Sequence, residues 1–187
     1  MINEMHPEAI KKILQEHKLW LVSNKAEGKI ANFQKANLQE ANLQETFLQE
    51  AILKEAILYW ANLQGANLQG ANLQGAKLQG AKLQKADLQR ANLKWAILQR
   101  AKLQKANFQS AILQRANLQE ANLRMADLRG AQLQGADLIA ANIVGAILDQ
   151  ANFEEANLNS IIVDKAAISN FPKSLIEKYG NTFLISG

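Results

Sequence analysis

Residues 61–100 read ANLQGANLQGANLQGAKLQGAKLQKADLQRANLKWAILQR, part of a five-residue pattern that runs from Ala31 to Ser160. Alanine opens every unit except the one at Thr46, and Leu, Phe or Ile stands two places later in every unit. On a helix, five residues advance by about 500°, so successive Leu side chains would share no face. On a straight strand, they would alternate between the two sides of the sheet.

The pattern is satisfied if each unit is a short extended piece followed by a bend. Ala86 and Leu88 then point the same way, and a turn before Ala91 brings the next pair back inside. Each unit buries its Leu by stacking on the coils above and below, about 4.8 Å away. We therefore expect an all-β parallel solenoid with polar positions outside and ladders of apolar side chains inside, such as Leu48, Leu68, Leu88, Phe108 and Leu128.

Units such as Ala61–Gly65 and Ala86–Arg90 resemble the A-(D/N)-L-x-x repeat of the pentapeptide-repeat family. Twenty-six consecutive units fit this repeat, and residues 161–170 read as two degenerate ones. The resemblance implies a right-handed quadrilateral parallel β-helix, with four units per coil and the central residue of each unit inside. The four consecutive corners Glu40, Glu45, Glu50 and Glu55 agree with four units per coil, as do Gly65, Gly70, Gly75 and Gly80.

Short α-helical caps are expected at both ends of the coil. Pro7 and the apolar residues after it predict an amphipathic helix over residues 7–20, and Pro172 opens a shorter helical pattern that ends at Gly180. Such helices would cover the open ends of the solenoid. We expect a monomer, with a dimer through Phe183–Ile185 as the alternative. The expected division is an N-terminal helical cap at 1–30, the β-helix at 31–170, and a C-terminal helical cap and tail at 171–187.

Residue types that carry catalysis or bind metals are scarce. There is no cysteine, and the two histidines, His6 and His17, lie outside the repeats; His17 falls on the apolar side of the expected helix, which favours a structural role. The sequence contains no nucleophile or phosphate-binding motif. We therefore predict no enzyme activity, cofactor or metal. The chain also lacks a long apolar run, which favours a cytoplasmic protein that does not enter membranes.

Polar residues at fixed repeat positions have architectural interpretations. The carboxylates Asp87, Asp127 and Asp137 occupy the second position, where Asn is otherwise common, and this alternation favours hydrogen bonding in turns. The recurrent Gln at the fourth position predicts amide ladders between coils, for example along Gln64, Gln84 and Gln104.

Two outward groups are the candidate partner-binding residues. With twenty residues per coil, one face gathers the cations Lys82, Lys85, Lys102, Lys105 and Arg124. Like charges about 5 Å apart repel by roughly 1 kcal/mol or less in water, so this cluster does not help folding but would attract an anionic partner. A second group is apolar and consists of Ile57, Tyr59 and Trp60, with Ile97 on the same face and Trp95 on an adjacent one.

Three functions compete on these observations. The first is a non-catalytic scaffold or protein-interaction module, with a protein as the partner. The second, implied by the resemblance, is a DNA mimic that modulates DNA gyrase, although such mimics use an acidic surface and residues 77–129 here are basic. The third is binding of nucleic acid through the basic face. A net charge of +4 does not decide among them.

Overall fold

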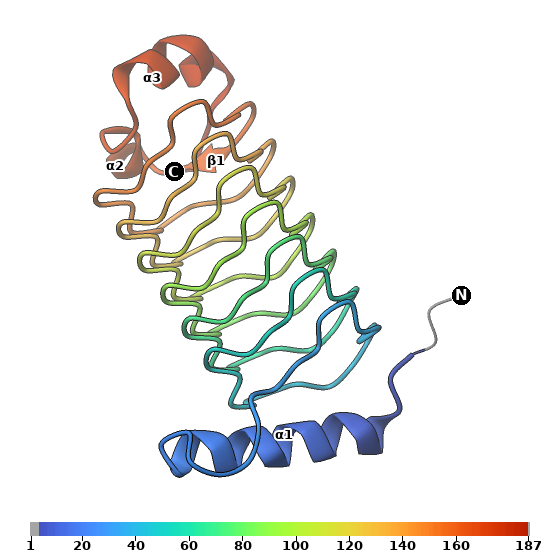
Figure 1. Ribbon diagram of the computed structural model, residues 1–187. Helices are drawn as coiled ribbons and strands as arrows, with labels where there is room; N and C mark the ends of the chain where they lie inside the picture. The colour runs from blue at the N-terminus through green and yellow to red at the C-terminus, as the bar shows by residue number, and fades with distance from the viewer. Residues whose placement is uncertain (1–3, 187) are drawn as a thin grey trace.

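The computed structural model describes residues 4–186 and shows a rod-shaped coil with helices at both ends (Figure 1). Helix α1 (Pro7–Val22) lies across the N-terminal end of the rod. At the other end are strand β1 (Ile162–Val163), the helices α2 (Lys165–Ile168) and α3 (Lys173–Tyr179), the 3-10 turn η1 (Gly180–Thr182) and strand β2 (Leu184–Ile185). None of the described helices is long and apolar enough to cross a membrane.

The coil repeats every twenty residues. Parallel bridges join second-position residues of successive coils, as in Asn62↔Lys82 and Lys82↔Lys102, so each coil contains four units and the rod has four faces. This confirms the expected quadrilateral arrangement. The bridges along the faces are single, and the described residues form regular strands only at β1 and β2, because each unit turns at its fourth and fifth residues. We number the faces from their first residues, which are Ala31, Ala36, Ala41 and Thr46.

The core is a stack of third-position side chains. From Leu43 to Leu138 every third-position residue is fully buried, and nearly all the Ala residues between them are buried as well. Burying one Leu side chain contributes about 1.5–3 kcal/mol, so stability accumulates along the rod. The small Ala side chain at the first position of each unit leaves room for the backbone, which turns inward there.

The fifth residue of each unit forms the corner and has a left-handed backbone. Trp60 has a φ of 54° and Gly65 a φ of 66°. The turn is closed by a hydrogen bond such as that from the Ala66 N–H to the Leu63 carbonyl (3.0 Å). A left-handed conformation costs a non-glycine residue about 1–2 kcal/mol, but cross-coil bonds hold the corners in place.

The N-terminal end is closed by α1 and by the residues before it. His17 on α1 is buried, its Nδ1 accepts the Ala31 N–H (3.1 Å), and its ring stacks on Trp20. Burial lowers the pKa of His17, while the Gln49 backbone and the Glu50 carboxylate act in the opposite direction. Glu4 pairs in parallel with Asn37 and so adds an extended segment to the second face.

One part of the expected repeat tract is wrong. Ile162 continues the third face through its bridge to Asn142, but residues 165–168, predicted as the end of the first degenerate unit and the start of the second, form helix α2. The physical reason is Asp164, whose carboxylate accepts the N–H groups of Ala167 (2.9 Å) and Gly145 (2.7 Å) and caps the helix. These hydrogen bonds lower the pKa of Asp164. Strand β2 then pairs in parallel with β1 and extends the third face.

Candidate interaction surface

The predicted cations lie together on the third face and at the corner that follows it. Lys82 and Lys102 are direct neighbours in one bridge, Lys85 and Lys105 occupy the corner one coil apart, and the Lys105 N–H donates to the Arg124 carbonyl (3.0 Å). All five side chains are exposed, and none forms a salt bridge with a described residue. Their positive charge therefore faces solvent without a matching carboxylate.

The predicted apolar group is spread over the second face and its two corners. Ile57 and Ile97 lie two coils apart and are separated by Lys77, which bridges to both. Tyr59 is half-buried, whereas Trp60 is 58% exposed at the corner toward the third face. Trp95 is 45% exposed at the opposite corner of the second face, with the Lys94 ammonium 4.4 Å from its ring centre. The cationic residues Lys77 and Lys94 thus interrupt the apolar surface.

The basic and apolar groups meet at the corner between the second and third faces. An open groove of about 570 Å³ lies there, which we call the corner groove, and its lining residues are Glu40, Trp60, Asn62, Gly80, Lys82, Arg100 and Lys102. It combines an exposed indole with two unpaired ammonium groups, which suits a ligand that carries an acidic group beside an apolar one.

Sequence reasoning missed Gly80 and Arg100 in this groove. Gly80 follows Trp60 by one coil, and a side chain there would collide with the indole, since a β-carbon would lie 2.5 Å from Trp60 Cδ1. Arg100 forms two hydrogen bonds to the Glu120 carboxylate, at 2.8 and 3.1 Å, and this pairing lowers the pKa of Glu120. The sequence signal that could have revealed these contacts is the spacing of twenty residues between Trp60 and Gly80 and between Arg100 and Glu120.

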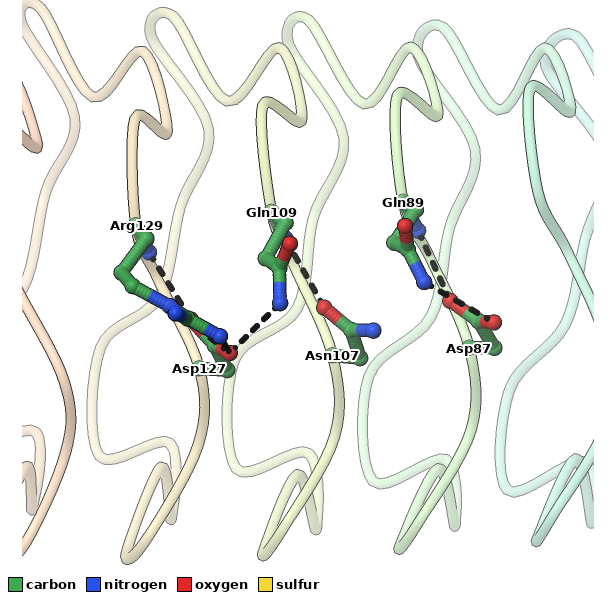
Figure 2. A network of polar contacts seen from close by, with 6 residues as sticks. All are labelled: Asp87, Gln89, Asn107, Gln109, Asp127 and Arg129. Carbon is green, nitrogen blue, oxygen red and sulfur yellow. Dashed lines mark hydrogen bonds and ion pairs between the residues drawn. The ribbon is translucent and has the colours of Figure 1, made fainter.

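The second-position carboxylates serve the architecture. The Asp87 Oδ1 accepts the Gln89 N–H (3.2 Å), which confirms the turn interpretation. Figure 2 shows Asp127 between Gln109 of the preceding coil and Arg129 of its own unit. The Gln109 Nε2 donates to Asp127 at 2.7 Å, and Arg129 pairs with it at 2.6 Å. The hydrogen bonds from Arg129 are the main cause that lowers the pKa of Asp127, and the hydrogen bond from Gln109 acts in the same direction.

The expected amide ladder forms one rung, in which the Gln99 Nε2 donates to the Gln119 Oε1 (3.4 Å), but it is wrong at the residues named for it. The buried Oε1 atoms of Gln84 and Gln104 have no hydrogen-bond partner among the described residues. Fourth-position amides on other faces mostly donate to a second-position side chain eighteen residues later, as Gln69 does to Asp87 (2.9 Å). The amide thus reaches diagonally across the coil, because the carboxylate is the stronger acceptor.

Within residues 4–186, no three His, Cys, Asp or Glu side chains gather as a metal site. His17, the one buried ionisable side chain of the described core, is used in the cap. The lack of enzyme activity and of cofactors stays a prediction.

Comparison with protein families finds the Pentapeptide repeats family, which matches in 8 copies across residues 31–70, 56–94, 66–104, 96–135 and 131–166. No match was found among curated proteins.

Solved structures give several similar chains. HetL, a pentapeptide repeat protein involved in heterocyst differentiation regulation from the cyanobacterium Nostoc sp. strain PCC 7120, is 32% identical; the match covers 71% of this chain and 76% of HetL, with a TM-score of 0.34. A trypsin-treated form of QnrB1, a plasmid-mediated fluoroquinolone resistance protein, is 18% identical over 80% of this chain and 87% of its own, with a TM-score of 0.50. A pentapeptide repeat protein from the cyanobacterium Cyanothece 51142 is 23% identical over 81% and 95%, with a TM-score of 0.37.

Proposed function

The chain belongs to the pentapeptide-repeat family, and from that premise we propose that it is a non-catalytic protein-interaction module. The proposed docking surface is the corner groove with the adjoining second and third faces. One observation carries the proposal: Trp60, Lys82 and Lys102, which the sequence separates into two groups, line a single open groove. A rod of stacked coils presents such a surface rigidly, so little ordering is lost when a partner binds.

A protein partner fits this surface better than a uniformly charged polymer does. The half-buried Ile57 and Tyr59 and the exposed Trp60 offer apolar area beside the cations, and protein interfaces commonly combine a buried aromatic anchor with a charged rim. The partner should therefore present a strip of Asp or Glu side chains next to an apolar side chain that contacts the indole.

Modulation of DNA gyrase by DNA mimicry is the alternative from the family resemblance. Between Lys77 and Arg115 the chain has nine Lys or Arg residues and only Asp87 as an acid. A DNA mimic needs the opposite sign of charge along its rod. A supercoiling assay with gyrase separates the two functions, and we expect unchanged supercoiling with excess protein.

Direct binding of nucleic acid is the second alternative. Its affinity for an oligonucleotide would fall steeply with salt and would not depend on the apolar second face. A gel-shift assay with an oligonucleotide at low salt tests this alternative. The protein-interaction proposal predicts that no shifted oligonucleotide complex requires both Trp60 and the lysines.

The proposal is tested by capture from native host extract with four immobilised proteins: wild type, Lys82→Glu/Lys102→Glu, Trp60→Ala, and the control Arg90→Glu/Arg115→Glu. The control reverses two exposed charges of the same basic region away from the corner groove, so both double variants have equal net charge. We expect one protein partner to be retained by wild type and control and lost from the other two. Equal retention by all four would contradict the proposal.

A further inference from the structure

The third face carries unpaired acids at its first coil and unpaired cations at its third and fourth coils. Glu40 and Glu45 occupy the two corners that border this face in the first coil. Both are exposed, and neither forms an ion pair within residues 4–186. The unpaired cations nearest to the same two corners are Lys102, Lys85 and Lys105. The two groups cannot neutralise each other within one chain, because three coils, or about 14 Å, separate Glu45 from Lys105.

An exposed aromatic ring lies between these two charged groups. Trp60 belongs to the second coil and is 58% exposed, and its indole lies against Gly80 of the third coil. At the same corner, Glu40 belongs to the first coil and Arg100 to the fourth. The ring therefore lies near the centre of a strip of four coils that is acidic at one end and basic at the other.

Such a strip is complementary to a second copy of itself that is turned end over end. A two-fold axis across the third face, between its second and third coils, places the first coil of each copy opposite the fourth coil of the other. Glu45 then faces Lys105 of the second copy, and Glu40 faces the end of the corner groove where Lys102 is unpaired. The two Trp60 rings meet at the axis. Because the relation is reciprocal, each charge pair occurs twice.

The same charges disfavour a parallel arrangement of two copies. A two-fold axis along the rod would place Glu40 opposite Glu45 of the second copy, and Arg100 opposite Lys105. Like charges that face each other across an interface oppose association. The charges of the third face therefore select the antiparallel orientation.

We propose that a second copy of this chain occupies the third face, in a symmetric antiparallel dimer. This inference rests on the proposed function, because it uses the same corner groove and names its partner. The first coil supplies the acidic strip that the groove requires, and Trp60 supplies the apolar contact. The four coils that overlap extend over about 19 Å, less than a standard interface needs, so we expect a dissociation constant of about 10–100 μM.

Sedimentation equilibrium of the purified full-length protein, at up to about 1 mM, measures this association. At about 0.1 M salt, charges more than about 10 Å apart are screened, so the net charge of +4 on each copy opposes the dimer only weakly. We expect a monomer–dimer equilibrium in wild type. Glu45→Lys and Lys105→Glu should each weaken it at least about tenfold, because each reversal makes two attractive pairs repulsive.

A charge exchange within one chain tests the pairing itself. The double variant Glu45→Lys/Lys105→Glu should restore the dimer. Both residue types already occupy this corner in the left-handed conformation, with φ of 55° at Glu45 and 60° at Lys105, so the exchange suits the local backbone. The matched control is Glu45→Lys/Arg115→Glu, which has the same net charge but alters a corner between the first and second faces. The control should not restore the dimer.

Two further comparisons locate the interface. Trp60→Ala should weaken the dimer at least about tenfold, because it removes the aromatic contact at the axis. Trp95→Ala removes an indole that is 45% exposed outside the third face and should leave the association unchanged. Leu184→Asp, which alters the tail considered for the alternative dimer, should also leave it unchanged.

Four results would overturn the inference: a monomer at 1 mM, no better association of the charge-exchanged variant than of its control, equal effects of Trp60→Ala and Trp95→Ala, or loss of the dimer in Leu184→Asp. These measurements use purified protein alone. The proposed function is judged separately by the capture from native extract, so the failure of one can be told from the failure of the other.

Discussion

The Trp60 indole lies against Gly80 one coil later, so close that a β-carbon on Gly80 would stand 2.5 Å from Cδ1 and 2.6 Å from Nε1. Both residues are corners with a left-handed backbone. The glycine is therefore needed for its conformation and for the space that it leaves to the aromatic ring. This contact also fixes one wall of the corner groove.

Gly80→Ala should destabilise the protein more than Gly70→Ala. Both changes place a side chain at a positive φ, at a cost of about 1–2 kcal/mol, but at Gly70 the nearest atom to the new β-carbon is the flexible Glu50 Cγ at 3.7 Å. The collision with Trp60 should add about 1–3 kcal/mol. Chemical denaturation measures the difference. In a Trp60→Ala background the two costs should become equal, and a persisting difference would refute the contact as its cause.

Leu88→Ala should lower the free energy of unfolding by roughly 2–5 kcal/mol, because it leaves a cavity in the middle of the buried ladder. Gln89→Ala, at the next position but facing outward, should cost well under about 1 kcal/mol. Urea unfolding of both variants checks this prediction. Similar losses would contradict the assignment of inside and outside positions.

The N-terminal cap should weaken as the pH falls below the ordinary His17 pKa of 6.5. Burial lowers the pKa in the folded cap, so the unfolded state takes up a proton first, and stability falls between 6.5 and the lower folded pKa before it levels off. A protonated ring would also present a donor to the Ala31 N–H, in place of an acceptor. Hydrogen exchange of α1 amides across this range measures the effect. A His17→Gln variant should lose this pH dependence; an unchanged profile would show that another group titrates.

Asp127→Asn should destabilise the protein at neutral pH by about 1 kcal/mol, because the charge that binds Arg129 and Gln109 is removed. The matched change Asp87→Asn should cost less, since the side chains that donate to Asp87 are the amides of Gln69 and Gln89, and no Arg of the described residues pairs with it. The folded pKa of Asp127 is lowered, so its contribution is present above the unfolded pKa and is lost as the pH falls through the folded pKa. Acid unfolding of wild type and both variants measures this; a larger loss from Asp87→Asn would contradict it.

The architecture of the rod could be predicted because the repeat is strict. An apolar residue at the third position of every five-residue unit is compatible only with a backbone that bends once in each unit. The corner residues indicated four units per coil. The grouping of Lys82 with Lys102, and of Ile57 with Ile97, followed directly from that number. The period does not determine the direction in which a surface side chain extends from its own position. The diagonal hydrogen bond from the Gln69 amide to Asp87 was therefore missed.

The ends of the rod were harder to predict, because they contain no repeat. The helix at residues 165–168 depends on a single cap by Asp164, a local signal that the five-residue period does not contain. The corner groove was missed for a related reason: the Trp60 indole that lines it lies in the space left by the missing side chain of Gly80, and an absent side chain gives no signal unless the residue one coil earlier is considered with it.

The most direct test of the twenty-residue coil is a disulfide between successive turns. The chain has no native cysteine. In the variant Lys82→Cys/Lys102→Cys the two backbones are neighbours in one parallel bridge, at a separation of about 5 Å that suits a disulfide. We predict rapid intramolecular cross-linking under mild oxidation, and none in Lys82→Cys/Asp87→Cys, whose positions lie on different faces. Cross-linking of the second pair without the first would contradict the coil and every surface grouping based on it.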